Sequence, residues 1–217
     1  MIVSRARGFV FVHIPKTGGT ALAQALESGA PESDLLIGDT PEARRRKPRL
    51  RGLRAAGRLR KHARLADLPG LVSEEEMLGL FVFTLVRNPW DRAVSYYHWL
   101  RGQRFAHPAV ALAQRVGFAD FLAHPQTRAG FRAAPYGAHV RLPSGEERCD
   151  AFVRLERFAA DIAPVERHLG VSLRLPGRVN ASQRARDWRG YYDTGTAALV
   201  AEDCAEDIAR FGYAFDG

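Results

Sequence analysis

The feature that most constrains the fold is a short apolar segment that runs into a glycine-containing loop and then into a helix. Residues Phe9–His13 read FVFVH, a run of apolar and β-branched residues that predicts a buried strand. The loop PKTGGT follows, and the spacing of Leu22 and Leu26 predicts a helix over Thr20–Glu27. A strand–loop–helix unit of this kind places the loop at the carboxyl end of the strand, where α/β sheets bind ligands.

The composition of this loop predicts an anion site. Two adjacent glycines let the backbone turn so that successive N–H groups point at one anion, and the following helix N-terminus adds partial positive charge. Lys16 supplies a full charge, and two threonines supply hydroxyl groups. We therefore predict that the site is formed by Pro15, Lys16, Thr17, Gly18, Gly19 and Thr20. The alternative is a Gly-Gly turn before an ordinary helix.

The order of residues differs from the Walker A pattern of ATP- and GTP-binding enzymes. That pattern places its lysine after the glycines and next to the hydroxyl that binds magnesium. Here the lysine precedes the glycines. This disfavours a nucleoside-triphosphate enzyme.

A second constellation, FTLVRNPWDRAVSYYHWLR, has the same architecture. Phe81–Val86 predicts a strong strand, Asn88 and Pro89 suit a helix start, and Trp90–Arg101 predicts the helix. The strand delivers Arg87 to the sheet edge, and Ser95 lies two turns along the helix. An arginine fork and a hydroxyl suit a phosphate group. Alternatively, Arg87 forms an ion pair with Asp91 and Ser95 is a surface residue.

Strands that alternate with helices predict an α/β fold. We expect a P-loop-NTPase-like three-layer domain, with a central, mostly parallel sheet flanked by helices, and a single domain over residues 1–217. Val140–Leu142 and Ala151–Leu155 flank PSGEE and predict a hairpin. Pro164 predicts either a kink within a helix over Phe158–Leu169 or a late helix start after Asp161.

Positive charge is concentrated in one segment. Residues 44–64 hold eleven Lys and Arg residues and no acid, whereas the remainder holds 21 basic and 24 acidic residues. We interpret about 40–64 as a basic, flexible insert. It is either a solvated segment or a patch that attracts an anionic substrate. A nucleic-acid arm is disfavoured because the segment has no aromatic residue for base stacking.

Other features bound the class of protein. No apolar stretch approaches the roughly 20 residues of a membrane helix. The apolar run near the start ends at Pro15 and Lys16 rather than at a small-residue cleavage site, which disfavours a signal peptide. Cys149 and Cys204 stand 55 residues apart and suggest neither a zinc site nor a disulfide framework. We expect a cytoplasmic protein with no metal.

Together, HIPKTGGT and VRNPWDRAVSYY resemble the 5′-phosphosulfate and 3′-phosphate motifs of sulfotransferases that use PAPS (3′-phosphoadenosine 5′-phosphosulfate). The chain is most similar to the family-2 type, which includes carbohydrate sulfotransferases of the heparan sulfate 2-O type. RLERF at 154–158, LPGRVNAS at 175–182 and the C-terminal stretch also resemble that family.

This resemblance implies roles for individual residues. The loop residues 15–20 would bind the 5′-phosphosulfate, with Lys16 compensating the charge on the departing phosphate. Arg87 and Ser95 would bind the 3′-phosphate. The run Asn180, Ser182, Arg184 and Arg186 would close over the adenosine or its 3′-phosphate, and the alternative is a surface loop. His62 stands where related enzymes carry a histidine base, and free histidine is largely neutral at cytosolic pH. His13 is the second candidate for the base, and a carboxylate is the third.

The expected acceptor is a hydroxyl on a sugar or glycan, and the basic segment would suit an anionic one. Candidate substrate-binding residues are His13, Arg58, Arg60 and Lys61. Two rival functions remain open, a P-loop-type kinase and a noncatalytic module that binds an anion or nucleic acid. We expect no nucleic-acid partner.

Overall fold

The structure is a computed structural model, and it describes residues 1–175, 184–185 and 187–216. The chain divides into two compact units. The first contains Met1–Val86 and Tyr136–Val179, and the second contains Arg87–Pro135 and Asn180–Gly217.

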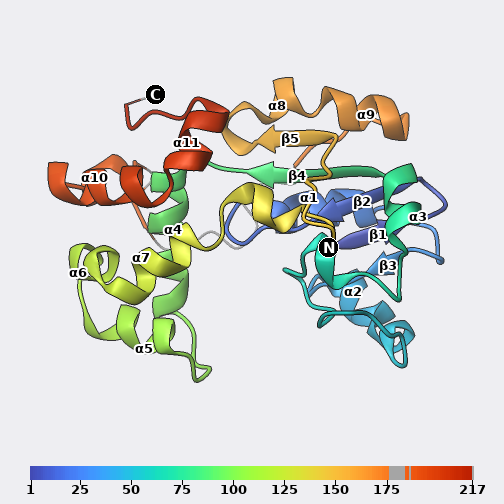
Figure 1. Cartoon of the computed structure of the whole chain (residues 1–217), viewed down its shortest axis with the longest axis horizontal. Helices are drawn as coiled ribbons and strands as arrows, with labels where there is room; N and C mark the ends of the chain where they lie inside the picture. The colour runs from blue at the N-terminus through green and yellow to red at the C-terminus, as the bar shows by residue number, and fades with distance from the viewer. Residues whose placement is uncertain (176–183, 186, 217) are drawn as a thin grey trace. The chain divides into compact units, whose positions relative to one another are not determined.

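A mixed five-stranded sheet forms the centre of the first unit, with the strand order β3-β1-β2-β4-β5 (Figure 1). The strands are β1 (Ile2–Ser4), β2 (Phe9–Val12), β3 (Leu35–Leu36), β4 (Phe81–Val86) and β5 (Ala151–Arg154). β4 lies parallel to both β2 and β5, whereas β1 is antiparallel to its two neighbours. The predicted α/β class is confirmed.

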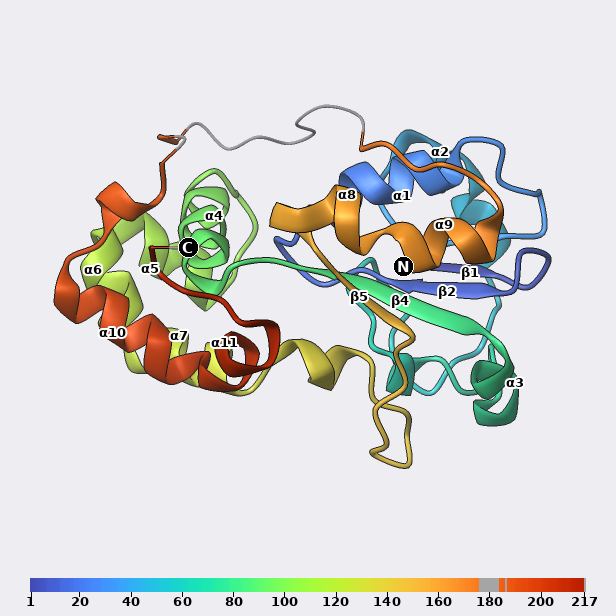
Figure 2. The same ribbon diagram turned by 90° about the horizontal axis from the view of Figure 1, so that it is seen from above.

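Helices cover both faces of this sheet, as Figure 2 shows. They include α1 (Gly19–Glu27), α2 (Pro41–Arg46), α3 (Glu74–Gly79), α8 (Phe158–Asp161) and α9 (Ala163–Leu169), with 3-10 turns η1 (Lys47–Leu50), η2 (Leu65–Asp67), η3 (Tyr136–His139) and η4 (Leu155–Arg157). Successive residues of a strand point to opposite faces. Phe9 and Phe11 therefore pack with α1, α8 and α9, whereas Val10 and Val12 pack with η2 and α3. Burial of β2 on both faces accounts for its continuous apolar sequence.

Two predictions about local structure have opposite outcomes. The break at Pro164 is confirmed, because α8 ends at Asp161 and α9 begins at Ala163. The predicted hairpin around PSGEE is wrong in its second strand. Arg141 and Glu147 form only an isolated antiparallel bridge, and β5 pairs in parallel with β4 instead. A parallel partner on β4 buries Val153, which a surface hairpin would expose.

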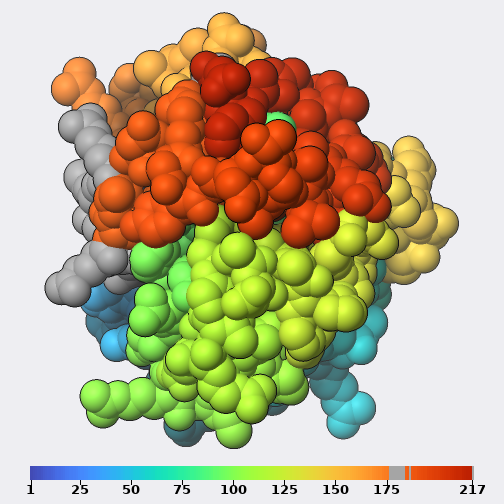
Figure 3. All heavy atoms as spheres, turned by 90° about the vertical axis from the view of Figure 1, so that its left-hand side faces the viewer, coloured from blue at the N-terminus to red at the C-terminus, as the bar shows by residue number. Residues whose placement is uncertain are grey.

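The second unit is helical in its described residues. It contains α4 (Pro89–Arg101), α5 (Pro108–Arg115), α6 (Phe118–Ala123), α7 (Pro125–Arg132), η5 (Arg189–Tyr191), α10 (Thr194–Asp203) and α11 (Ala205–Phe211). The Asn88 side chain caps α4 by accepting a hydrogen bond from the Trp90 N–H, as the sequence predicts. Figure 3 shows the side chains of α10, in orange-red, lying directly against those of α6 and α7, in yellow-green.

An aromatic core and a buried carboxylate hold these helices together. Trp90, Tyr97 and Phe121 pack with Val200 and Cys204, so residues from α4, α6 and α10 share one core. Asp203, at the end of α10, accepts hydrogen bonds from two arginines of α7. Within the part of the chain that the structure describes, none of the helices is both long enough and apolar enough to span a membrane.

Candidate anion-binding site

The glycine loop follows β2 and ends at the first residue of α1. Lys16 has a φ of 67° and Gly18 a φ of 88°, so the loop contains two left-handed residues. A lysine in this conformation is uncommon, because its Cβ is crowded there. No side chain of the described residues caps the N-terminus of α1, and no acidic residue lies in its first turn. The loop therefore presents a positively biased helix start beside a half-buried lysine.

Close packing on two sides fixes this loop. A Cβ on Gly19 would lie 2.4 Å from Cδ2 of His13, and a Cβ on Gly18 would lie 2.9 Å from Cδ1 of Leu155. Both distances are shorter than side-chain carbons tolerate. Gly19 is thus required by its contact with the buried His13 ring, whereas Gly18 is required by its positive φ, because the Leu155 side chain that it meets is flexible.

The two threonines of the loop have different roles. The Thr17 hydroxyl is buried and donates to the Ile14 carbonyl at 3.0 Å, so any contribution of Thr17 to an anion site comes from its backbone N–H. The Thr20 hydroxyl accepts a hydrogen bond from Nζ of Lys61 at 2.9 Å and keeps its own proton for donation. Lys61 also forms an ion pair with Asp39, with 2.7 Å between Nζ and Oδ1. Lys61 therefore places an ammonium group at the start of α1, with its charge balanced by Asp39.

His62 is held beside the loop in a defined tautomer. Its Nδ1 lies 2.8 Å from the carbonyl oxygen of His13. A carbonyl can only accept, so Nδ1 carries the proton and Nε2 keeps a lone pair. Burial disfavours the charged imidazole and, with the positive charge of Lys61, lowers the pKa of His62 to about 4. At neutral pH His62 is thus an uncharged proton acceptor at Nε2.

His13 occupies the interior of the same cluster. Its side chain is only 4% exposed, and its ring meets that of His62 edge to face, with 4.8 Å between the centroids. Burial, together with the nearby positive charges of Lys61 and Lys16, holds the pKa of His13 well below its ordinary value. The structure therefore gives His13 a packing and orienting position, with its ring facing the loop rather than solvent.

The second unit brings together Arg87 and Arg184 on one carboxylate. Arg87 donates from Nε and Nη2 to Oδ2 of Asp91, at 2.9 and 2.6 Å, which is the ion pair that the spacing allowed. Arg184 donates from Nη2 to the other oxygen, Oδ1, at 2.6 Å. Asp91 thus joins Arg87, two residues before α4, to Arg184, a residue more than ninety positions later in the chain.

The second unit also contains buried side-chain nitrogen atoms that have no hydrogen-bond partner among the described residues. They are Nη1 of Arg184, whose side chain is 10% exposed, and Nε2 of His98. Burial lowers the pKa of His98, and the positive charges of Arg101 and Arg184 lower it further. Ser95, one turn before His98 on α4, is also buried. A buried guanidinium N–H without a partner is costly, and an anion would satisfy it.

The remaining predicted residues divide into two groups. Arg58 and Arg60 are exposed and form no ion pair with any described residue. Asn180, Ser182 and Arg186 lie outside the described residues. Asp39, the partner of Lys61, is a site residue that the sequence did not indicate, because it lies in a loop without periodicity.

Comparison with known proteins finds similarity among solved structures. No family model matches the chain, and no curated protein matches it. A solved structure that resembles it is that of the mouse sulfotransferase SULT7A1 complexed with PAP. The two are 16% identical, with a TM-score of 0.49, and the match covers 94% of this chain and 85% of that chain.

The contact between Gly19 and His13 generates a stability prediction. Gly19→Ala should lower the free energy of unfolding by about 1–3 kcal/mol, because the new methyl group overlaps a buried ring. Urea unfolding measures this change. Gly79→Ala, in α3, is the matched control: a Cβ there meets nothing within 4 Å, so this variant should be neutral or slightly stabilising. Equal effects of the two substitutions would contradict the close packing.

The environment of His62 generates a titration prediction. The imidazole signal of His62, identified by its absence from the NMR spectrum of His62→Gln, should titrate with a midpoint near pH 4. The pKa is lowered because burial penalises the protonated ring. The neutral form of His62 therefore persists from pH 7 down through pH 5. A midpoint near the ordinary value of about 6.5 would show that the ring is solvated and not held as described.

Proposed function

We propose that this protein is a PAPS-dependent sulfotransferase. The observation that carries the proposal is in the first unit, where a neutral histidine with a free Nε2 stands beside a lysine-containing glycine loop at a helix start. Lys61 links the two features, because it precedes His62 in the chain and donates to Thr20 of the loop. Sulfuryl transfer to a hydroxyl needs both an anion cradle and a base.

In the proposal PAPS is a substrate, and its negative charge is matched by cationic side chains and backbone N–H groups of the described residues. In the proposal the loop residues 15–20 bind the 5′-phosphosulfate, with Lys16 as the main countercharge and the N–H groups at the start of α1 as donors. The 3′-phosphate binds Arg87, Ser95 and Arg184. The unsatisfied Nη1 of Arg184 supports that assignment, since a phosphate oxygen would satisfy it. Asn180, Ser182 and Arg186 belong to this proposed donor site by sequence alone.

The reaction in the proposal balances without a further reactant. The acceptor oxygen forms a bond to sulfur while the bond between sulfur and the bridging phosphate oxygen breaks. Nε2 of His62 takes the hydroxyl proton, and its Nδ1–H stays bonded to the His13 carbonyl, which favours the developing imidazolium. Lys16 compensates the negative charge that accumulates on the departing phosphate, as cations do in phosphoryl transfer. The products are a sulfate ester and 3′-phosphoadenosine 5′-phosphate (PAP).

We further propose a carbohydrate hydroxyl as the acceptor, a family-2 type of enzyme and a cytoplasmic location. The acceptor proposal is supported by Arg58, Arg60 and Lys61, which lead directly to His62 in the chain and would suit an anionic glycan. His13 takes an indirect part, since its carbonyl orients His62.

The two rival functions make different demands on the same residues. A P-loop-type kinase needs a lysine after the glycines and a magnesium-binding hydroxyl, yet here Lys16 comes first and the Thr17 hydroxyl is committed to the backbone. A noncatalytic binding module gives no reason for a buried histidine with a fixed tautomer. Both observations favour group transfer from PAPS.

Ligand preference tests the donor assignment. In calorimetry, PAP should bind the unmodified protein, and ATP should bind at least tenfold more weakly. Lys16→Ala should weaken PAP binding by about tenfold or more, because a charge-assisted contact contributes about 1.5–3 kcal/mol. Lys16→Arg keeps the charge and should lose less. Tight binding of ATP without binding of PAP would overturn the proposal in favour of the kinase.

The base assignment has its own test. His62→Gln keeps a hydrogen-bond donor toward the His13 carbonyl but has no basic nitrogen, so kcat for sulfation of a hydroxyl acceptor should fall by about 10²–10⁴. PAP affinity should stay within about twofold. The matched control is His107→Gln, a change to an exposed histidine of the second unit. Unchanged kcat in His62→Gln would assign the proton transfer to another group.

A further inference from the structure

A cavity of about 720 Å³ lies in the first unit, in the segment that follows α2. Its volume is within the range of about 300–1,000 Å³ that small-molecule sites occupy. Four cationic residues, Arg44, Lys47, Arg51 and Arg54, contribute to its lining. Of the described residues that line it, none is acidic. A cavity with this lining attracts anions.

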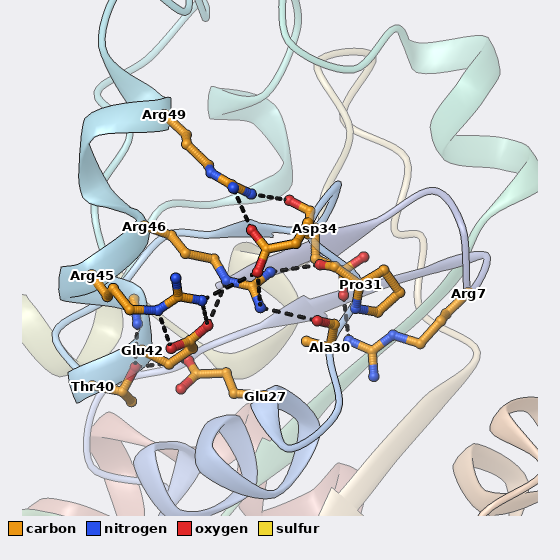
Figure 4. Close-up of polar contacts among 12 residues, drawn as sticks. Arg7, Glu27, Ala30, Pro31, Asp34, Thr40, Glu42, Arg45, Arg46 and Arg49 are labelled. Atoms are coloured by element: carbon orange, nitrogen blue, oxygen red, sulfur yellow. Dashed lines mark hydrogen bonds and ion pairs between the residues drawn. The ribbon is translucent and has the colours of Figure 1, made fainter.

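The arginines of the same segment fall into two groups by their partners. One group forms ion pairs with acids: Arg45 and Arg46 pair with Glu42, and Arg49 pairs with Glu32. Figure 4 shows part of this network. Arg46 is buried among these contacts and also donates to the Ala30 carbonyl at 2.9 Å. These three arginines therefore hold the segment in place, and because acids balance them they contribute little to the positive potential around it.

The cationic lining of the cavity is not neutralised in this way. Arg44, Lys47, Arg51 and Arg54 form no ion pair with any described residue, although Glu32 and Glu42 are near in sequence. Four like charges around one space repel one another, so a bound anion would relieve that repulsion. The charge that the segment keeps is thus gathered at the cavity.

The rest of the lining is apolar. Leu50, Leu53 and Leu59 contribute, and none of the lining residues that the structure describes is aromatic. Leu50 and Leu59 pack against the part of the core that contains Val10 and Val12 of β2, whereas Leu53 is exposed. An exposed leucine beside charged groups offers apolar surface that an alkyl chain can cover.

Backbone contacts build the wall that carries Arg54 and the residues after it. The Ala56 N–H donates to the Pro69 carbonyl at 2.7 Å, and the Gly57 N–H donates to the Asp67 carbonyl at 3.0 Å. A Cβ on Gly57 would lie only 2.0 Å from Oδ1 of Asp67, so the chain approaches closely there. The lining is therefore anchored to the segment around η2.

From these observations we infer that the cavity binds an amphipathic anion, a single molecule with a sulfate, phosphate or carboxylate head and an aliphatic tail. The head would contact the four cations, and the tail would contact the leucines. A glycan or a nucleic acid fits less well, because neither has an aliphatic tail for the leucines and no aromatic side chain is present to stack on a sugar or base. This inference goes beyond the proposed function and does not depend on it.

Calorimetry with three probes tests the inference. Octyl sulfate, below its micelle concentration, should bind with one site and at least tenfold more tightly than inorganic sulfate or the neutral octyl glucoside. The affinity should fall as salt is raised. Because Lys16 does not line the cavity, octyl sulfate should bind Lys16→Ala as it binds the unmodified protein. An affinity for inorganic sulfate equal to that for octyl sulfate would overturn the inference.

Variants locate the site. The double variant R51Q/R54Q should weaken octyl sulfate binding by about tenfold or more, because contacts to charged groups are lost. Leu53→Ser should weaken the binding of octyl sulfate by about three- to tenfold and leave the binding of inorganic sulfate unchanged. The control R104Q/R115Q removes the same charge from exposed sites of the second unit and should have less than a twofold effect.

The same variants separate a single bound molecule from a membrane surface. Binding to vesicles of phosphatidylglycerol, with no binding of monomeric octyl sulfate, would overturn the cavity site and indicate surface adsorption. Equal losses of octyl sulfate affinity in R51Q/R54Q and R104Q/R115Q would also overturn the cavity site. Thermal unfolding should show all these variants folded, since none of the changed side chains is buried.

Discussion

The contacts of His13 are the constraint on which the proposed catalytic centre depends. Its carbonyl fixes the tautomer of His62, and its ring lies so close to Gly19 that no side chain fits between them. One buried residue directly after β2 therefore sets the position of the loop, the start of α1 and the direction of the His62 lone pair. Because its burial also disfavours a charge on the ring, the two imidazoles stay neutral, and the charged groups around them are Lys16 and the Lys61–Asp39 ion pair.

The elements that the sequence predicted well are those whose signal is local. Phe81–Val86 is an uninterrupted apolar run, and it forms β4 with the predicted bounds. Asn88 and Pro89 mark the start of α4 because capping chemistry involves only a few neighbouring residues. The loop at 15–20 was recognised from its composition, since glycine, lysine and threonine each have a direct use at a helix start.

What the sequence did not reveal depends on partners far along the chain. β5 pairs with β4 although a hairpin with its neighbour was predicted, because the choice is set by burial of Val153 rather than by the turn. The role of Asp39 depends on Lys61, in a segment whose sequence shows only an excess of positive charge. Within that segment Arg46 is buried, because its guanidinium pairs with Glu42, an acid that precedes the basic run by only a few residues.

The Asp91 carboxylate gives the second unit a form of preorganisation. Each of its oxygens accepts from a different guanidinium group, so Arg87 and Arg184 are already ordered in the folded chain. The rotamer entropy of two long side chains is thus lost on folding, and an incoming phosphate would not have to immobilise them again. In the proposed donor site the same carboxylate would repel that phosphate, so the order that Asp91 imposes on the two guanidinium groups would come with weaker electrostatic attraction.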